Sequence, residues 1–211
     1  NVNIFETNVD TLAIQGPKSF GLMEEVFGSE IKKLGFFKYD FYKFKNCNFL
    51  ISRSGFSKQG GYEIHVDNKE KGLELYDYFF SIGDKYNLKP GAPNHPERIE
   101  GGLLSYGNDM LITDNPFECG FDNYVNLDSN IVFLARESLK KIKKDGIKKK
   151  LMGLKIDTNR LDLDDFLIFN DKKQNIGEIR SIAFSPKFKK IVGIAMVKID
   201  YCKNNETFNM N

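Results

Sequence analysis

Apolar residues recur with strand-like and then helix-like spacing at the start of the chain. Val9–Gln15 alternates apolar with polar positions, as in a strand with one buried face. Gly16-Pro17 interrupts this alternation, and Pro17 suits the first turn of a helix. The helix should bury one apolar face and end at Gly28, a common C-cap residue. That face consists of Phe20, Met23, Val26 and Phe27.

The next segment is predicted to form strands and then two helices. The strands are expected at Phe36–Phe44, Cys47–Arg53 and Tyr62–Val66, and the first two should pair around Lys45-Asn46. Helical spacing follows in Lys69–Tyr86 and Pro96–Ser105. This order predicts an α+β fold, a mixed-sheet α/β sandwich with the helices on one face of the sheet.

The pattern changes after Phe133. Arg136–Lys144 is expected to form a short basic helix that ends at Gly146, and mostly strands follow. Short strands at such spacing predict a small antiparallel β-barrel, so the fold class remains α+β. We place the boundary near Lys148, with one domain at residues 1–147 and a second at residues 148–211. The expected barrel strands are Leu151–Asp157, Phe166–Asn170, Gly177–Phe184 and Ile191–Ile199.

Composition narrows the possible functions only moderately. The 211 residues include 31 basic and 29 acidic ones, a net charge of +2 that makes no general case for nucleic acid. No apolar run is long enough to cross a membrane, and no signal peptide is visible after Asn1. Cys47, Cys119 and Cys202 are widely separated and form no C-x-x-C pair. They argue against a disulfide framework or a zinc site and favour a reducing, cytoplasmic setting.

The segment from Ser52 to His65 offers the most informative chemistry. It is expected to form a strand, a glycine-rich loop and another strand, and the glycines would let a flat ligand approach the backbone. Phe56 could stack on a pterin ring, and the Glu63 carboxylate could accept two of its N–H donors. From spacing alone, a plain hairpin with Phe56 in the core and Glu63 exposed is the favoured interpretation.

The other polar candidates are weaker. His95 is expected on a surface loop, and Tyr106 and Asp109 are expected to be structural, because Gly-Asn-Asp is a common turn. Arg98 and Glu100 could form a buried pair within a helix. The acidic cluster near residue 164 lacks the glycine and the closing glutamate of a calcium loop, so we expect a solvated turn and no metal. That cluster is Asp162, Asp164 and Asp165.

Several segments resemble those of glycine-cleavage T-proteins, in the same order. Residues 52–64 are similar to SRTGYTGEDGFEI, residues 12–17 to LALQGP, and residues 98–109 to RLEAGxxLYGND. Asn115–Glu118 is similar to TPVE, and the last strands resemble the barrel pattern GxVTS…SP…IGxA. Together these matches cover nearly the whole chain.

Within that superfamily, the finer resemblance is to the dimethylsulfoniopropionate (DMSP) demethylases. It rests on Ser57–Glu63, Asn115–Gly120 and Ser185–Lys190. Asn94 stands where T-proteins carry an arginine that contacts folate. Phe56 and His65 stand where the demethylases carry Trp and Tyr.

The resemblance implies transfer of a methyl group to tetrahydrofolate, with DMSP as the expected donor, and requires no metal. It assigns Glu63, Phe56 and Tyr62 to the cofactor and His65 and Phe56 to the donor. The catalytic residues are left unknown, because the key Asp of the family would precede Asn1 in a segment absent here. We therefore expect this stretch alone to hold part of a site and to expose apolar surface.

Three alternatives or additions stay open. One is a glycine-cleavage aminomethyltransferase, and another is a non-catalytic folate-binding module, whose K-G-C-Y-x-G-Q-E signature does not occur in the sequence. The basic run from Lys140 to Lys150 is expected to be a solvated helix end, with a docking site for a folate polyglutamate tail as the other interpretation. A homodimer is the assembly to test, and neither nucleic acid nor membrane is an expected partner.

Overall fold

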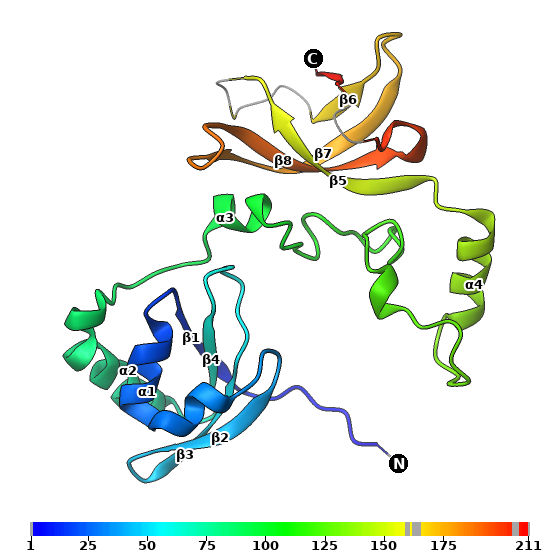
Figure 1. Ribbon diagram of the computed structural model, residues 1–211. Coiled ribbons are helices and arrows are strands. Elements are labelled where there is room, and N and C mark those ends of the chain that lie inside the picture. The colour runs from blue at the N-terminus through cyan, green and yellow to red at the C-terminus, as the bar shows by residue number, and fades with distance from the viewer. Residues whose placement is uncertain (1, 159–160, 162–165, 204–206, 211) are drawn as a thin grey trace. The chain divides into compact units, whose positions relative to one another are not determined.

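The computed structural model describes residues 2–158, 161, 166–203 and 207–210. The chain divides into two compact units, residues 1–94 and residues 95–211, each with its own core (Figure 1). Within the described residues, no helix is both long and apolar enough to cross a membrane.

The first unit is built on a four-stranded sheet in the order β1-β4-β3-β2. All of its strand pairs are antiparallel, so the sheet differs from the mixed one expected, although the α+β class is confirmed. The β2–β3 hairpin turns at Lys45-Asn46, as the sequence predicted. The strands are β1 (Asp10–Gln15), β2 (Tyr39–Phe44), β3 (Cys47–Ser52) and β4 (Gly61–Val66).

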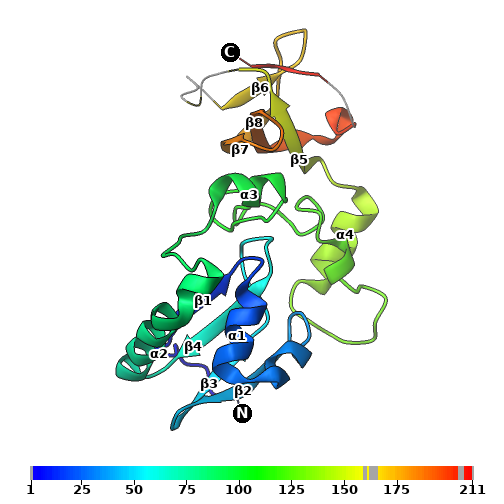
Figure 2. The same ribbon diagram turned by 60° about the vertical axis from the view of Figure 1, so that its left-hand side comes forward.

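Helices α1 (Ser19–Phe27) and α2 (Lys69–Ile82) cover one face of this sheet (Figure 2). Alternate residues of the strands meet the apolar helix faces there, which is why the strands alternate in burial. Short 3-10 helices follow them at η1 (Ser29–Lys33) and η2 (Gly83–Tyr86). The fully buried side chains of this core include Leu22, Met23, Phe49, Ile51, Tyr62, Ile64, Leu75 and Phe79.

The opposite face of the sheet is open within the first unit. Tyr39 and Phe41 of β2 are 70% and 64% exposed, and Phe36 and Phe37 just before β2 are also exposed. These four aromatic side chains agree with the expectation that the chain exposes apolar surface.

The second unit is built on a five-stranded sheet in the order β5-β8-β7-β6-β9, again with antiparallel pairs. Seven consecutive residues of β8, from Ile191 to Val197, are buried. This run is continuous because Ile99 of α3 packs against one side of the sheet while a second apolar cluster fills the other side. The strands are β5 (Lys149–Ile156), β6 (Leu167–Phe169), β7 (Asn175–Ser185), β8 (Lys190–Lys198) and β9 (Asn209–Met210).

The helices of the second unit differ from the prediction in one place. α3 spans His95–Glu100 and ends earlier than expected, because Gly101-Gly102 follows and Gly102 has a positive φ of 64°. His95 therefore begins a helix and does not lie in a loop, which corrects that expectation. The other helices are η3 (Asp122–Tyr124), α4 (Arg136–Asp145, with Gly146 as its C-cap) and η4 (Ile199–Tyr201). β5 begins at Lys149, one residue after the proposed domain boundary, which stays a prediction.

Candidate functional site

Strand register places Glu63 and His65 together on the open face of the first sheet. In β4, Tyr62, Ile64 and Val66 point into the helix-covered core, so the alternate residues Glu63 and His65 point the other way and are half-buried. Both come from one strand, two residues apart, and they face the same side.

The residues beside them in the sheet are uncharged. Glu63 lies between Ala13 of β1 and Ser52 of β3, and His65 lies between Thr11 and Leu50. A carboxylate and an imidazole therefore share a patch in which their direct cross-strand neighbours bring no competing charge.

A chain of hydrogen bonds joins these two side chains. The Ser54 hydroxyl donates to Oε2 of Glu63, and Oγ of Ser52 lies 2.8 Å from Oγ of Ser54. Oγ of Ser52 also lies 3.3 Å from Nε2 of His65. Sequence reasoning missed both serines, although their Ser-x-Ser spacing at the end of a strand puts them on one face.

Gln15 fixes the glycine-rich loop that carries Ser54. Its Nε2 donates to the carbonyl oxygens of Ser54 and Tyr62 at 3.0 and 3.2 Å, and its Oε1 accepts from Ser57 at 2.7 Å. A Cβ on Gly55 would lie 2.1 Å from Oε1 of Gln15, so a side chain there would displace this amide from its hydrogen bonds. The side-chain amide of Gln15 thus joins the motif at residues 12–17 to the motif at residues 52–64.

Phe56 lies in this loop, two residues beyond Ser54, and its side chain is 38% exposed. The plain-hairpin interpretation placed Phe56 in the core and Glu63 in solvent, and the structure differs from it on both points. The structure brings Glu63 and His65 together through the two serines, and it leaves Phe56 available to solvent on the adjoining loop.

Tyr62 lies on the other side of the sheet. Its side chain is fully buried, its hydroxyl donates to the carbonyl oxygen of Ile31 at 3.3 Å, and its ring meets the edge of Phe20. Burial raises the pKa of the Tyr62 phenol above its ordinary value. Strand alternation therefore makes Tyr62 a core residue, and its side chain does not join Glu63 in the site proposed below.

The second unit holds a different polar cluster, which is buried. Arg98 donates to Oδ2 of Asp109 at 2.7 Å, and both side chains are nearly or fully inaccessible. Ser181 of β7 donates to the other Asp109 oxygen and accepts from Arg98. Asp109 is thus structural, as expected, but Arg98 does not pair with Glu100. The Glu100 carboxylate instead accepts a hydrogen bond from Ser185.

A second buried cluster surrounds Asp114, which the sequence did not single out. Arg180 and Lys149 both donate to its carboxylate. Burial raises the pKa of Asp114, but the hydrogen bonds from Arg180 and Lys149 outweigh burial and hold the pKa well below its usual range. These contacts tie the loop around Asp114 to β5 and β7.

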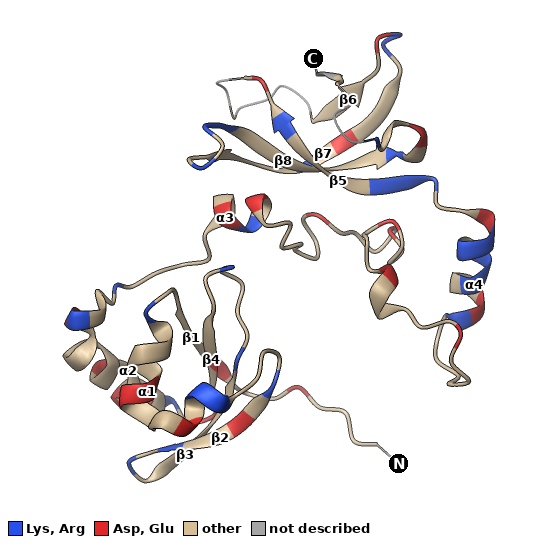
Figure 3. Ribbon diagram, in the orientation of Figure 1, with Lys and Arg blue, Asp and Glu red and all other residues tan. Residues whose placement is uncertain are grey.

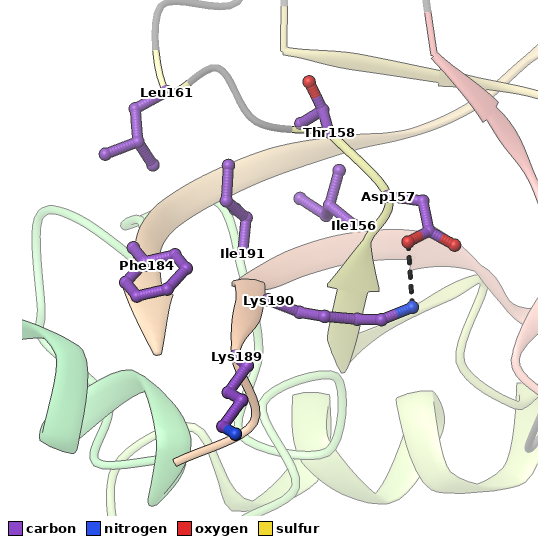
Figure 4. A pocket seen from close by; sticks show the side chains of 8 residues that line it. All are labelled: Ile156, Asp157, Thr158, Leu161, Phe184, Lys189, Lys190 and Ile191. Carbon is purple, nitrogen blue, oxygen red and sulfur yellow. Dashed lines mark hydrogen bonds and ion pairs between the residues drawn. The ribbon is translucent and has the colours of Figure 1, made fainter. Parts of the chain in front are cut away.

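The remaining candidates do not assemble a site. Tyr106 is 69% exposed, while Asp162, Asp164 and Asp165 lie outside the described residues. The lysines of α4 line an exposed helix (Figure 3), and Lys140 pairs with Glu137 of the same helix at 3.0 Å. A pocket of about 460 Å³ in the second unit is lined by apolar Ile156 and Phe184 beside the Lys190–Asp157 ion pair (Figure 4).

Comparison with known proteins identifies the family. The model of the GCVT N-terminal domain matches residues 1–129, and that of the glycine cleavage T-protein C-terminal barrel domain matches residues 149–211. The chain belongs to the glycine cleavage T-protein family.

Two members of this family are similar to the chain over nearly its whole length. The chain is 36% identical over 197 residues to a dimethylsulfoniopropionate demethylase of Ruegeria pomeroyi, covering 93% of the chain and 54% of that protein. It is 30% identical over 205 residues to an aminomethyltransferase of Thermoanaerobacter pseudethanolicus, covering 96% and 55%. It therefore spans about half the length of these relatives.

A solved structure supports the fold. The aminomethyltransferase T of the Bartonella henselae glycine cleavage system superimposes with a TM-score of 0.83 at 20% identity, over 95% of this chain and 54% of that one. The α+β fold with a C-terminal barrel, which the sequence predicted, is thereby confirmed. The roles of Glu63, His65 and Phe56 stay a proposal.

Proposed function

We propose that this chain is part of a tetrahydrofolate-dependent methyltransferase that demethylates DMSP. The observation that carries the proposal is the Glu63 carboxylate, which is half-buried on an open sheet face with one oxygen fixed by Ser54. A carboxylate held in this way can accept two adjacent N–H groups of a pterin ring, which fixes the orientation of the ring. Membership of the T-protein family supports folate as the ligand.

The donor assignment rests on chemistry and on similarity. The relative from Ruegeria pomeroyi is named a dimethylsulfoniopropionate demethylase. A sulfonium is already an activated methyl donor: the N5 lone pair forms a bond to the methyl carbon, the C–S electron pair returns to sulfur, and N5 releases its proton. The products are 5-methyltetrahydrofolate and methylmercaptopropionate, and the protein acts by aligning N5 with the methyl carbon and excluding water.

In this proposal, Phe56 and His65 contact the donor. An aromatic face attracts a sulfonium cation, although a phenyl ring does so less strongly than an indole. His65 would contact the donor through the ring nitrogen that does not face Ser52. His65 is linked to Glu63 through the two serines, and Phe56 lies two residues beyond Ser54 in the loop.

The second candidate is aminomethyl transfer in glycine cleavage. It is favoured by the aminomethyltransferase of Thermoanaerobacter pseudethanolicus, which is 30% identical. Against it stand Asn94, where T-proteins carry arginine, and Ser57–Gly61, which differs from their Thr-Gly-Glu-Asp-Gly pattern.

Mass spectrometry of reaction products separates the two candidates. The full-length protein is incubated with tetrahydrofolate and DMSP, and in parallel with tetrahydrofolate and an aminomethylated glycine-cleavage carrier protein. We expect 5-methyltetrahydrofolate and methylmercaptopropionate in the first mixture. Formation of 5,10-methylenetetrahydrofolate in the second mixture alone would instead establish the aminomethyltransferase.

Two further features belong to the same proposal. A reducing, cytoplasmic setting is supported by Cys47, Cys119 and Cys202, none of which is in a disulfide. We also propose that the protein forms a homodimer and that it binds small molecules and no nucleic acid. Light scattering of the purified protein would measure the mass of the assembly directly.

A further inference from the structure

The hydrogen bonds between Glu63 and His65 have a defined direction. An ionised carboxylate only accepts hydrogen bonds, so the single proton of the Ser54 hydroxyl is used on Glu63. The contact of 2.8 Å between Ser52 and Ser54 then requires the Ser52 hydroxyl to be the donor, and this contact is much shorter than the 3.5 Å from that hydroxyl to its other acceptor, the backbone carbonyl oxygen of Glu63. With that proton used, the 3.3 Å contact between Ser52 and His65 requires Nε2 of His65 to carry a proton.

We propose that Ser52 and Ser54 are positioning residues that form a one-way donor chain from Nε2–H of His65 to the Glu63 carboxylate. This donor chain orients the Glu63 carboxylate for its ligand and fixes the tautomer of the His65 imidazole. This inference rests on the proposed function, because it assigns Glu63 and His65 to the two substrates of one reaction.

Among the described residues, those beside Glu63 and His65 in the sheet offer no other charged group that could couple these two side chains, which leaves the donor chain through Ser52 and Ser54. The cross-strand neighbours of Glu63 and His65 are Ala13, Thr11, Leu50 and Ser52, none of which is charged or titrates in the physiological range. Gln15 holds the backbone carbonyl of Ser54, so the serine that meets Glu63 is itself fixed. Only hydroxyl groups lie between the carboxylate and the imidazole along the chain.

Two consequences follow for ligands. Ser54 uses a lone pair of Oε2, and the remaining acceptor positions of the carboxylate keep a fixed orientation toward a ring that brings N–H donors. At the other end, Nε2 of His65 contacts Ser52, so Nδ1 is the ring nitrogen left for the methyl donor, and in this tautomer it is a hydrogen-bond acceptor. The two ligands would therefore sense each other through four side chains.

Nuclear magnetic resonance of the histidine rings tests the direction of the chain. The sequence has two histidines, so His95→Gln leaves the ring of His65 as the one signal. In long-range proton–nitrogen spectra of the 211-residue chain we expect the Nε2–H tautomer, with a ring N–H protected from exchange with water. A wild-type His65 that is mainly the Nδ1–H tautomer overturns the proposal, and this measurement needs no other variant.

Substitution of a residue that His65 does not touch gives the sharper test. In Ser54→Ala the Ser52 hydroxyl loses its nearest acceptor and can donate to Nε2, which at 3.3 Å is closer than the Glu63 carbonyl oxygen at 3.5 Å, so the Nδ1–H population of His65 should rise. Ser54→Thr keeps the hydroxyl and should restore the wild-type spectrum. If His65 is unchanged in Ser54→Ala while the protein stays folded, the donor chain does not exist.

Binding of tetrahydrofolate separates this inference from the proposed function. Ser54→Ala should weaken binding about tenfold, because a hydrogen bond to a charged group is lost, and Ser54→Thr should stay within about twofold of wild type. If Glu63→Gln leaves tetrahydrofolate affinity unchanged, the proposed function fails while the ring spectra still decide the chain. If Glu63→Gln weakens binding but Ser54→Ala does not, the positioning role of Ser54 is rejected.

Discussion

The two units treat charged side chains in opposite ways. In the second unit, Arg98, Asp109 and Ser181 are buried, and each carboxylate oxygen of Asp109 already accepts a hydrogen bond from the protein. In the first unit, Glu63 and His65 are half-buried on an open face, and a single serine donates to one oxygen of Glu63 among the described residues. A buried polar group must be fully paired within the fold, whereas a binding group keeps part of its capacity for a ligand.

This contrast gives a physical reason for the different roles of the acidic residues. Asp109 and Glu63 both stand in family motifs, and the sequence already favoured a structural role for Asp109. The number of protein partners and the degree of burial assign Asp109 to stability and leave Glu63 with acceptor capacity for the ligand proposed above. The following changes would break or sharpen that distinction.

The largest effect is expected for Asp109→Ala. Removing this carboxylate leaves Arg98 buried without its anion, which should destabilise the second unit by about 3–5 kcal/mol. Urea unfolding followed by circular dichroism measures the change. A loss below about 1 kcal/mol would show that the cluster is not structural.

A somewhat smaller loss is expected for Asp114→Asn, because Arg180 keeps its 2.8 Å bond to Glu178. The change should also alter the acid limb of stability. The folded-state pKa of Asp114 lies below its ordinary value of 3.8, so its contribution is present above about pH 4 and is lost as the pH falls toward the folded pKa. Thermal melts between pH 2 and pH 7 should therefore fall less steeply on the acid side in the variant. Parallel acid limbs would contradict the assignment.

Glu63→Gln should weaken ligand binding and leave stability nearly unchanged, the opposite of the two aspartate variants. Losing the carboxylate leaves ring N–H donors unpaired, at about 1–3 kcal/mol, so tetrahydrofolate should bind about tenfold more weakly or worse. The unfolding midpoint should hardly move, and binding of the methyl donor should change much less. Calorimetric titration with each ligand measures this, with Glu30→Gln, an exposed glutamate of the same unit, as the matched control. A loss of stability with unchanged folate affinity would make Glu63 a structural residue.

The smallest effect is expected for Asp157→Asn. Its ion pair with Lys190 (Figure 4) is open to solvent, since the Asp157 side chain is 90% exposed. Exposed pairs contribute little, because water screens them and two long side chains must be ordered. The urea midpoint should stay within experimental error. A clear destabilisation would show that burial is a poor guide to which charges matter in this protein.

The sequence predicted most of the elements correctly, since apolar periodicity reflects which face of a strand or helix is buried. It placed the α1 cap at Gly28, the turn at Lys45-Asn46 and the basic helix α4, and the structure confirms each within a few residues. The motifs also identified the family, because several short segments in the same order are specific where each alone is not.

Tertiary structure alone decided which polar groups meet. The carboxylate partner of Arg98 is 11 residues away and not two, and the partners Lys149 and Arg180 of Asp114 are 35 and 66 residues away. Such pairs depend on how loops fold onto a sheet, which local spacing does not encode. Similarly, the sequence placed Tyr62 beside Glu63, and one-residue alternation along β4 sent the two side chains to opposite faces. Glu63 was found by its motif, but its hydroxyl link to His65 exists only because β3 and β4 pair in this register, which sets Ser52 beside Glu63.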